Sequence, residues 1–597
     1  MMKQAKELLK KYYGYDSFRD SQEEVINSIL NKKDTLAVMP TGAGKSVCYQ
    51  IPSILFKGTT IVISPLISLM KDQVDSLVNI GIPSAYINSS LSNGDTNDRI
   101  EKALRGEYKL LYIAPERLES DYFKELVKKL DISMVAVDEA HCVSQWGHNF
   151  RPSYVNIASF ISELKEKPII TAFTATATDE VKQDITNLLD LNDPNIYVSS
   201  FDRENLNFAV LRGQNKKNFL LTYIEANKDS SGIIYAATRK EVDKIYDMLI
   251  NKAYKVGKYH AGMSDEARKD IQEKFMYDDI KIIVATNAFG MGIDKSNVRY
   301  VIHNNMPKNI EAYYQEAGRA GRDGEKSECI LLFAPQDVML QKYLIDLNPV
   351  SVDRKILENR KLQCMVDFCH TERCLRKYIL EYFGEKNVPE SCGNCSSCND
   401  TREVSDITIE AQKIFSCIVH MKQKYGGVLI AEVLRGSKNK RLLSLNFDKL
   451  STYGIIKNYT IDEIKDLINL LIAEEYLGLT ESEYPVVILK NKAITVLKGK
   501  EQVFQKLEKK RQKQKVEISS SLFDELREVR KEIAIRKKVP PYIIFADSAL
   551  KGMCELLPLD KTSMLSVKGV GEVKFERYGD EFISAIKKYC DENGKSN

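Results

Sequence analysis

The chain has 597 residues, of which 43% are hydrophobic and 28% charged. A domain typically takes roughly 100–200 residues, so this length predicts about three to six domains. The composition is that of a globular protein and excludes wholesale disorder, a collagen-like fibre and a membrane bundle. The formal net charge of only +4 excludes a chain that is basic throughout, and 12 cysteines in a cytosolic protein indicate metal ligands or buried thiols rather than disulfides.

The N-terminal sequence MMKQAKELLKKYYGYDSFRD is charged throughout and lacks the apolar core and cleavage site of a signal peptide. No apolar run approaches the ~18 residues that span a bilayer. We therefore expect a cytoplasmic protein without a membrane partner.

Short apolar runs alternate with longer amphipathic stretches between about residues 36 and 198. They are strand-sized, rich in β-branched residues and end at proline or polar residues: TLAVMP, TIVISP, KLLYIAP, MVAVDEA and IITAFTATAT. Such runs with helices between them are typical of a parallel α/β sheet covered on both faces. A second set, SGIIYAAT, KVGKYHAGM, KIIVATNAFG, VRYVIH and ECILLFA, predicts a second α/β domain after a break near residues 200–212.

The pattern changes after residue 334, where helices lead to a cysteine cluster that ends at Cys398. Residues 407–497 mix helical periods with short strands such as PVVILKN. The stretch 498–515 carries eight Lys or Arg residues and two Glu, a local net charge of +6, which predicts a linker or a solvated helix. The remaining residues, from Ser521, are helical in pattern.

The segment MPTGAGKSVCYQ follows the strand TLAV, precedes a helical pattern and contains a short phosphate-loop signature. Its glycines allow backbone N–H groups to curl around phosphate oxygens at a helix N-terminus, where the helix dipole also favours negative charge. Lys45 would reach the β- and γ-phosphates, and Ser46 would ligate Mg²⁺. The nucleotide-binding residues predicted in this segment are Thr41, Gly42, Gly44, Lys45 and Ser46.

The strand MVAV delivers Asp138 and Glu139 at its carboxyl end, where open α/β sheets bind ligands. Asp138 would hold Mg²⁺ through water, and Glu139 would polarise the attacking water. The four letters DEAH are a weak signal alone. At the end of a later strand, after a phosphate loop, they indicate nucleotide hydrolysis.

With these motifs the chain resembles the RecQ family of DNA helicases, in order and over nearly its whole length. The resemblance implies two RecA-like parallel-sheet motor domains, a helical zinc-binding subdomain, a winged helix and a small all-α HRDC-like domain. The corresponding limits are residues 1–204, 205–336, 337–404, 405–497 and 521–597, with a basic linker over 498–520. In YGYDSFRDSQ it implies that Tyr15 stacks on the adenine, that Gln22 bonds to the base edge and that Arg19 supports the nucleotide.

DNA contacts are a further implication of the resemblance. Lys71, in SPLISLMKDQV, would hold a phosphate, which positions a strand without reading its bases. The loop SQWGHNFRPSY follows the DEAH box and combines aromatic and basic side chains suited to base stacking and phosphate binding. Its predicted DNA-binding residues are Trp146, His148, Phe150 and Arg151. A core aromatic cluster is the alternative, which the polar residues of the loop disfavour.

In the second α/β domain, YQEAGRAGRDG carries Arg319 and Arg322, which are close to one helical turn apart if the segment is helical. An arginine finger neutralises charge that builds up in the transition state of phosphoryl transfer. The resemblance implies this role for both arginines, with Gln315 as an orienting residue. Thr174 and Thr176, in TAFTATAT, would link the γ-phosphate region to the DNA side.

The segment CLRKYILEYFGEKNVPESCGNCSSC contains Cys374 and then a C-x-x-C-x-x-C run of Cys392, Cys395 and Cys398. Tetrahedral zinc needs four soft ligands, and C-x-x-C lets one turn supply two thiolates. The polar loop offers almost no apolar surface to bury free thiols, so a metal is predicted. An iron–sulfur cluster is the alternative, because four cysteines also hold such a cluster.

The C-terminal half also follows the family. Residues 407–497 resemble its winged helix, in which residues 437–441 form a polar basic element suited to a duplex backbone. In the HRDC-like tail, Tyr542 would stack on single-stranded DNA.

These observations predict an ATP-dependent DNA helicase that moves 3′ to 5′ and acts in DNA repair, recombination or replication; the polarity comes from the resemblance alone. The expected cofactors are ATP, Mg²⁺ and Zn²⁺. The expected partners are DNA and a single-stranded-DNA-binding protein. The protein is expected to be a monomer that is located at the bacterial nucleoid. A DEAH-type RNA remodeller is disfavoured by the tryptophan loop, the zinc knuckle and the HRDC-like tail. A DNA-junction scaffold with a vestigial ATPase is disfavoured by the complete set of ATPase residues.

Overall fold

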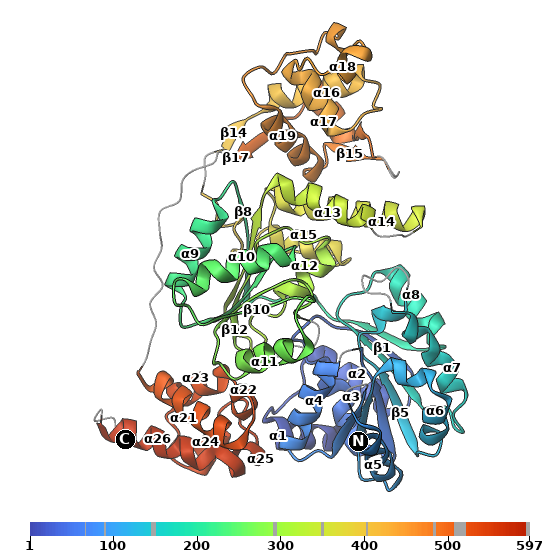
Figure 1. Cartoon of the computed structure of the whole chain (residues 1–597), viewed down its shortest axis with the longest axis vertical. Coiled ribbons are helices and arrows are strands. Elements are labelled where there is room, and N and C mark those ends of the chain that lie inside the picture. The colour runs from blue at the N-terminus through green and yellow to red at the C-terminus, as the bar shows by residue number, and fades with distance from the viewer. Residues whose placement is uncertain are drawn as a thin grey trace.

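In the computed structural model, two α/β lobes form the body of the molecule (Figure 1). The structure describes residues 1–65, 67–88, 91–144, 151–290, 295–347, 351–401, 404–480, 485–506 and 521–592. The module that contains α16 to α19 (residues 408–473) lies at one end of the molecule. The last helices, α21 to α26 (residues 521–592), lie at the opposite end, next to α1 (Met2–Tyr13) and α11 (Asp265–Met276) of the two lobes (Figure 1).

The first lobe contains a parallel sheet whose described strands follow the order β3-β4-β2-β5-β6-β1-β7. Their bounds are β1 Thr35–Val38, β2 Thr59–Ile63, β3 Ser84–Ile87, β4 Leu110–Ile113, β5 Ile132–Val137, β6 Ile169–Thr174 and β7 Asn195–Val198. Leu36 and Val38 pack into one core cluster and Ala37 and Met39 into another, because successive side chains of a strand point to opposite faces. The sheet is therefore buried on both sides, as its apolar runs predict.

Helices of the first lobe cover these two faces. On one face lie α1 Met2–Tyr13, α2 Asp20–Leu30, α3 Lys45–Leu55 and α4 Ile67–Asn79. On the other lie α5 Asn93–Leu104, α6 Asp121–Val127, α7 Asn156–Ser162 and α8 Asp179–Leu188, with the 3₁₀ turns η1 Pro115–Glu119, η2 Ala140–Val143 and η3 Pro152–Val155.

The second lobe repeats the design with a parallel sheet whose described strands follow the order β10-β11-β9-β12-β13-β8. Their bounds are β8 Leu206–Arg212, β9 Ser231–Tyr235, β10 Val256–Tyr259, β11 Ile282–Ala285, β12 Val298–His303 and β13 Ser327–Phe333. Its helices are α9 Lys216–Ala226, α10 Arg239–Ile250, α11 Asp265–Met276 and α12 Ile310–Ala317. The two parallel-sheet lobes confirm the predicted fold class.

The sequence predicted a break between the lobes near residues 200–212, but the second half of this range forms a strand in the structure. Leu206–Arg212 form β8, which pairs with β13 along its whole length, and Leu206 and Phe208 are buried. The run FDREN is polar after Phe201, and the strand begins directly after it, so the sequence pattern does not reveal where the strand starts. The connection between the sheets is therefore short and covers residues 199–205.

Beyond the lobes, α13 Pro335–Leu347, α14 Val352–His370 and α15 Leu375–Tyr382 precede the module at the end of the molecule. That module contains β14 Val404–Asp406, α16 Thr408–His420, α17 Gly427–Arg435, α18 Lys440–Ser444, η4 Phe447–Lys449, α19 Ile461–Ala473, β15 Leu477–Leu479, β16 Val487–Leu489, α20 Asn491–Leu497 and β17 Phe504–Lys506. The C-terminal module contains α21 Ser521–Lys537, α22 Pro541–Ile544, α23 Asp547–Leu556, α24 Lys561–Leu565, α25 Glu572–Lys574, the π-helical turn η5 Phe575–Gly579 and α26 Asp580–Glu592.

One strand lies inside the predicted basic linker. Phe504–Lys506 form β17, which pairs antiparallel with β14 about one hundred positions earlier in the chain. Residues 507–520 of that linker lie outside the described residues. The domain limits proposed from the sequence remain predictions.

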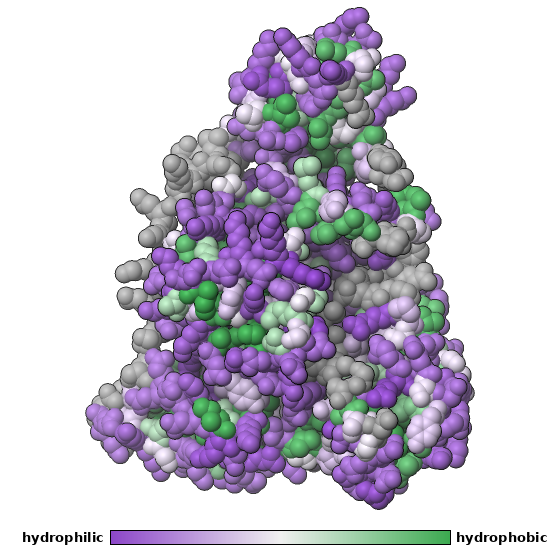
Figure 2. Space-filling model, viewed as in Figure 1, coloured by the Kyte–Doolittle hydropathy of each residue, from purple (hydrophilic) through white to green (hydrophobic). Residues whose placement is uncertain are grey.

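The molecular surface is hydrophilic over most of the face in Figure 2, with apolar side chains in scattered groups. Among the helices that the structure describes, none has both the length and the hydropathy to cross a bilayer.

Gly14 fixes the C-terminal module against the first lobe. It ends α1 in the left-handed region at φ 75°, and a Cβ there would lie 2.5 Å from the Gly571 nitrogen and 2.6 Å from the Val570 carbonyl carbon. We expect Gly14→Ala to detach the module, because both contacting atoms are backbone and cannot move aside alone. Energy transfer between dyes on the first lobe and on α26 would measure the separation.

The control for this variant is Gly106→Ala. Gly106 also has a left-handed φ of +72°, but no atom lies within 4 Å of its Cβ position. Both variants carry the same left-handed strain of about 1–2 kcal/mol. Equal dye distances in the two variants would contradict the proposed docking contact.

Candidate active site

A cavity of about 830 Å³ lies between the two lobes and the C-terminal module. All the residues that the sequence assigned to nucleotide, magnesium or catalysis line it. From the first lobe these are Tyr15, Arg19, Gln22, Thr41, Gly42, Gly44, Lys45, Ser46, Asp138 and Glu139, and from the second lobe Gln315, Arg319 and Arg322. Segments about 300 residues apart in the chain thus meet around one cavity, which is large enough for a nucleoside triphosphate.

The phosphate loop connects β1 to α3 at the floor of this cavity. Gly42 and Gly44 both adopt left-handed φ values, +85° and +80°, which glycine allows without steric cost. Helix α3 starts at Lys45, so the free N–H groups of its first turn face the loop. The Lys45 ammonium donates to the Met39 carbonyl at 3.2 Å, which folds this side chain back along the loop.

The loop backbone is held from outside by α2. The Arg19 guanidinium donates to the Gly42 carbonyl at 3.0 Å. The Gln22 amide donates to the carbonyls of Ala43, at 2.9 Å, and Gly44, at 3.3 Å. Its Oε1 accepts from the Arg19 backbone N–H at 3.1 Å. Gln22 therefore buttresses the phosphate loop in this structure, and its contact with a base edge remains a prediction.

The two carboxylates stand at the carboxyl end of β5, two strands from the phosphate loop in the sheet. The backbone of Asp138 is fixed on both sides, because its N–H donates to the Ile63 carbonyl at 2.8 Å and its carbonyl accepts from the Tyr154 hydroxyl at 2.9 Å. Burial, and then the neighbouring Glu139 carboxylate, raises the pKa of Asp138 to about 7. A divalent cation would offset both effects, and the Asp138 carboxylate and Ser46 hydroxyl are the hard oxygen ligands that Mg²⁺ prefers.

Glu139 is connected to the next strand through His141. Glu139 has a left-handed φ of 47°, and its Oε2 lies 3.3 Å from the His141 Nδ1. That Nδ1 also lies 2.9 Å from the hydroxyl of Thr174, at the end of β6, which in turn donates to the Thr176 carbonyl at 3.1 Å. Hydrogen bonds thus connect Thr174 and Thr176, the threonines predicted to link the γ-phosphate region to the DNA side, to the Glu139 carboxylate.

The second lobe presents its arginines from a turn. Helix α12 ends at Ala317, so Arg319 and Arg322 follow the helix and do not share one of its faces. The glycines of GRAGRDG disfavour a continued helix, and Gly321 adopts a left-handed φ of +57°. Arg319 is nearly buried and donates to the Gly290 carbonyl. Both arginines nevertheless line the cavity together with Gln315.

The residues predicted to contact DNA are only partly described. Trp146, His148 and Phe150 lie outside the described residues. The Arg151 guanidinium donates to the Pro65 carbonyl at 3.0 Å, so it joins the segment after the DEAH box to the one that precedes α4. Lys71, on α4, pairs across the lobes with Glu273 of α11 at 3.8 Å.

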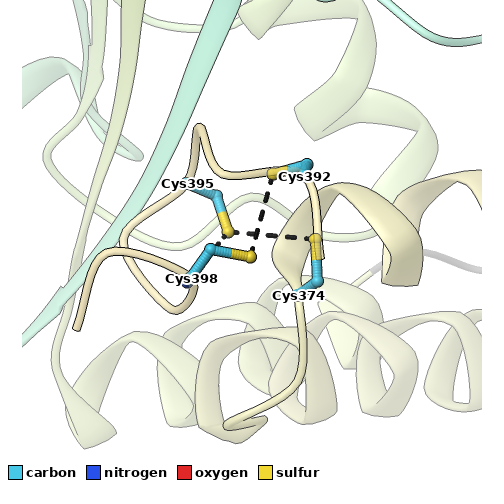
Figure 3. Close-up of side chains that lie close together, drawn as sticks. All are labelled: Cys374, Cys392, Cys395 and Cys398. Atoms are coloured by element: carbon cyan, nitrogen blue, oxygen red, sulfur yellow. Dashed lines mark hydrogen bonds between the residues drawn. The ribbon is translucent and has the colours of Figure 1, made fainter. Parts of the chain in front are cut away.

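Four cysteine side chains converge next to β8 (Figure 3). The Sγ atoms of Cys374, Cys392, Cys395 and Cys398 all lie within 4.8 Å of one another. Two Sγ pairs, Cys392 with Cys398 and Cys374 with Cys395, are 3.9 and 4.0 Å apart. A single zinc ion with Zn–S bonds of about 2.3 Å requires thiolates about 3.8 Å apart. An iron–sulfur cluster places several irons and sulfides between its cysteines, so the close sulfurs fit zinc.

Family models match the chain in five consecutive segments. They are the DEAD/DEAH box helicase (residues 19–184), the helicase conserved C-terminal domain (215–324), the RecQ zinc-binding model (335–399), the RQC domain (401–514) and the HRDC domain (519–586). The ATP-dependent DNA helicase RecQ of Bacillus subtilis is 48% identical over 591 residues, 99% of each chain. The chain belongs to the RecQ family of helicases. The RecQ enzyme of Haemophilus influenzae is 40% identical over 98% of this chain and 95% of its own.

A third relative carries a different name. A protein of Acanthamoeba polyphaga mimivirus, provisionally named an ATP-dependent RNA helicase, is 39% identical over 83% of this chain and 92% of its own length. RNA therefore belongs among the substrates tested below.

Two features of this RecQ chain escaped the sequence reasoning. The C-terminal module lines the nucleotide cavity with Tyr542, Ala546, Leu565, Ser566, Val567 and Lys568. Tyr542 was predicted only as a DNA contact, a role that remains a prediction, and the sequence contains no signal for where a separate module docks. The second feature is the position of Arg203, which lies in the connection between the lobes and contacts the phosphate loop and the turn of the two arginines. The sequence showed only a polar break there.

Proposed function

We propose that this RecQ-family protein is an ATP-dependent DNA helicase that couples ATP hydrolysis to 3′–5′ movement on one DNA strand and to duplex unwinding. One observation carries the proposal: a single cavity joins a phosphate loop and two carboxylates of one lobe to two arginines of the other. A ligand that bridges such a cavity favours the closed arrangement of the lobes, and hydrolysis removes that bridge. Service in DNA repair, recombination or replication is part of the same proposal.

The predicted site residues that line the cavity each have a role in this proposal. The phosphate loop, with Lys45, would bind the β- and γ-phosphates, and Ser46 and Asp138 would hold Mg²⁺, which neutralises phosphate charge when bound. Glu139 would take a proton from the attacking water. Arg319 and Arg322 would neutralise the charge that develops on the transferred phosphoryl group, with Gln315 as an orienting residue.

The remaining proposed roles concern the base, the DNA and the metal. Tyr15 would stack on the adenine, supported by Arg19 and Gln22. Arg151 and Lys71 would hold DNA phosphates, a role that for Lys71 requires release from Glu273. The Zn²⁺ ion, bound by Cys374, Cys392, Cys395 and Cys398, would fix the fold of its subdomain and take no part in hydrolysis.

Finer proposals rest on the family alone. We propose that the protein acts as a monomer, that it meets a single-stranded-DNA-binding protein, and that it works at the nucleoid in a bacterial cytoplasm. Sedimentation of the purified protein and pull-down with that partner test the first two directly.

The function is tested with Lys45→Ala beside Lys102→Ala, a lysine of α5 that pairs with Asp98 far from the cavity. ATP hydrolysis and strand separation are measured on tailed DNA and tailed RNA. We expect DNA-stimulated hydrolysis and unwinding in the wild type and in Lys102→Ala, and a loss of at least about 10²-fold in Lys45→Ala. Equal stimulation by RNA would favour an RNA remodeller, and DNA binding without turnover a scaffold.

A further inference from the structure

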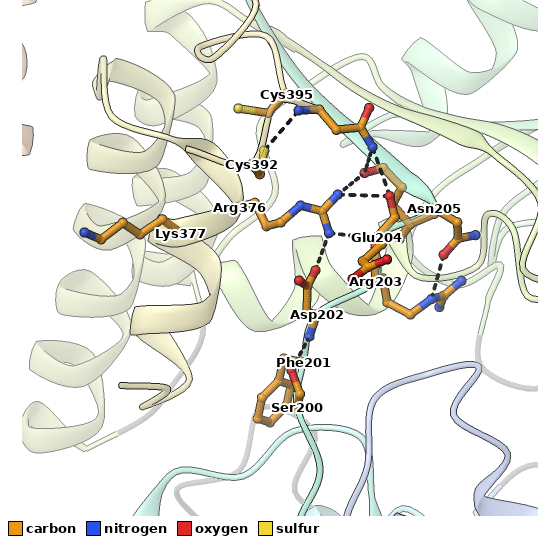
Figure 4. Close-up of polar contacts among 12 residues, drawn as sticks. Ser200, Phe201, Asp202, Arg203, Glu204, Asn205, Arg376, Lys377, Cys392 and Cys395 are labelled. Carbon is orange, nitrogen blue, oxygen red and sulfur yellow. Dashed lines mark hydrogen bonds and ion pairs between the residues drawn. The ribbon is translucent and has the colours of Figure 1, made fainter. Parts of the chain in front are cut away.

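Residues 199–205 are the covalent connection between the sheets of the two lobes, and one of their side chains enters the active-site region. Figure 4 shows this connection, with Arg203 extending from one side of it and Arg376 of a neighbouring helix approaching from the other. Arg376 comes from α15, and Arg203 turns toward the first lobe. The two arginines therefore connect the same seven residues to different parts of the molecule.

The guanidinium of Arg203 touches both halves of the active site. On the side of the first lobe, its Nη1 donates to the carbonyl of Thr41, in the phosphate loop, at 2.6 Å. On the side of the second lobe, the same Nη1 reaches the Gly318 carbonyl at 3.4 Å, and Nη2 donates to the carbonyls of Ala320, at 3.1 Å, and Gly321, at 2.7 Å. These last three carbonyls belong to the turn that carries both predicted finger arginines.

The packing around this guanidinium leaves little freedom. A Cβ on Gly42 would lie 2.8 Å from the Arg203 Nη1, so a larger residue there would displace the end of this side chain, and the φ of +85° also favours glycine. Behind Arg203, the Asn205 side chain accepts from its Nε at 3.3 Å and donates to the Gly321 carbonyl at 2.9 Å. The carbonyl of Arg203 itself accepts from Arg376 at 2.7 Å.

The acceptors of the Arg203 side chain are neutral. Each hydrogen bond described for its guanidinium ends on a backbone carbonyl or on the Asn205 amide, and burial lowers its pKa. Even partial burial of a cation costs free energy unless hydrogen bonds or an opposite charge compensate it. Only a planar guanidinium offers five donors in a fixed fork that can reach carbonyls on two separate loops at once.

We propose that Arg203 is a positioning residue for hydrolysis: it holds the turn of Arg319 and Arg322 in register with the phosphate loop. Arg203 lies on the connection between the lobes, so it would couple a change in their relative position to both loops. The inference rests on the proposed ATPase function. Arg203 should therefore stabilise the transition state of hydrolysis, in which the charges of Arg319 and Arg322 act. It should have no effect on the binding of ADP, which lacks the γ-phosphate.

The test compares Arg203→Gln and Arg203→Lys with the control Arg212→Gln in the full-length protein. Arg212, on β8, is a similarly half-buried arginine whose contacts, Glu372 and the His370 carbonyl, lie away from the cavity. We measure kcat and KM for DNA-stimulated ATP hydrolysis, and the affinities for ADP and for ADP with aluminium fluoride. A misplaced catalytic group costs about 10²-fold in rate, and we expect a fall of this order in kcat for Arg203→Gln.

The affinities separate positioning from folding. In both Arg203 variants we expect wild-type affinity for ADP, which reports an intact phosphate loop, and loss of the extra affinity for the aluminium fluoride complex. Lysine should not restore it, because one ammonium cannot span the two loops. Unchanged kcat in Arg203→Gln, or a parallel loss of ADP affinity, would overturn the inference. Absence of hydrolysis in the wild type would instead refute the proposed function.

Discussion

Glu139→Gln is expected to abolish steady-state ATP hydrolysis while leaving ATP binding intact. Removal of a general base costs about 10²–10⁴-fold in rate, and glutamine keeps the size of the side chain but cannot accept a proton from water. The backbone of Glu139 is held by its N–H, which donates to the Asp138 Oδ1 at 2.9 Å, so the substitution leaves the loop in place. Unwinding should stop with hydrolysis.

The measurement is a single-turnover experiment with DNA present, beside equilibrium binding of ATP. Glu163→Gln is the matched control, because Glu163 is an exposed carboxylate of the same lobe whose partner is Lys128 at 3.0 Å. We expect the control to hydrolyse at the wild-type rate. Comparable rates in Glu139→Gln and the control would remove Glu139 from the mechanism, and loss of ATP binding would make its role structural.

The sheets of both lobes could be predicted from the sequence because their strands are buried on both faces. Runs such as TLAV and IIVA are almost continuously apolar, so they can be recognised without knowledge of the strands beside them. The carboxyl-end rule then brings the phosphate loop and Asp138 to one edge of the first sheet. These predictions depend on local composition and on chain direction alone.

The strands at the edges of the sheets were harder to predict from the sequence. The edge strand β7 exposes Ile196 and Val198 and follows a polar turn, and β8 begins directly after FDREN. Pairing decides whether such a segment is a strand, and its partner is remote in sequence: β8 pairs with β13 more than one hundred positions later. Local pattern cannot supply that information.

The parts of the site that sequence could not predict are contacts between modules. The family resemblance implies that Gln315 and both arginines face the nucleotide, but it does not predict that the helix ends before Arg319. Arg203 contacts four backbone carbonyls on two loops. Every residue has a backbone carbonyl, so the residue types at these positions do not reveal the contacts. The same reason hides the docking of Val567 and Lys568 at the cavity.

Cys395→Ser is expected to release the zinc ion and to destabilise the second lobe along with the cysteine cluster. Cys395 is fully buried and forms a bridge with Phe208 of β8, and the next residue donates its N–H to the Phe208 carbonyl at 2.8 Å. Structural zinc contributes about 10–16 kcal/mol of apparent binding free energy, as much as the about 5–15 kcal/mol that stabilises a whole domain. We therefore expect the cluster to unfold when its ion is removed.

The damage should extend to the connection between the lobes. Cys374 directly precedes α15, whose Arg376 pairs with Asp202 and donates to the Arg203 carbonyl at 2.7 Å. Figure 4 shows this guanidinium between the cysteine loop and residues 200–205. When the cluster unfolds, the anchor on one side of the connection is lost, so DNA-stimulated hydrolysis should fall together with the melting temperature.

Zinc content, melting temperature and hydrolysis are measured on Cys395→Ser and on Cys554→Ser, a cysteine of the C-terminal module outside the cluster. We expect one zinc per chain and wild-type behaviour in the control. Wild-type protein treated with a strong chelator should reproduce the Cys395→Ser defect, because the ion and not the thiol carries the stability. A chelated protein that has lost its zinc but keeps its melting temperature would mean that Phe208 and α15 hold the cysteine loop without the metal.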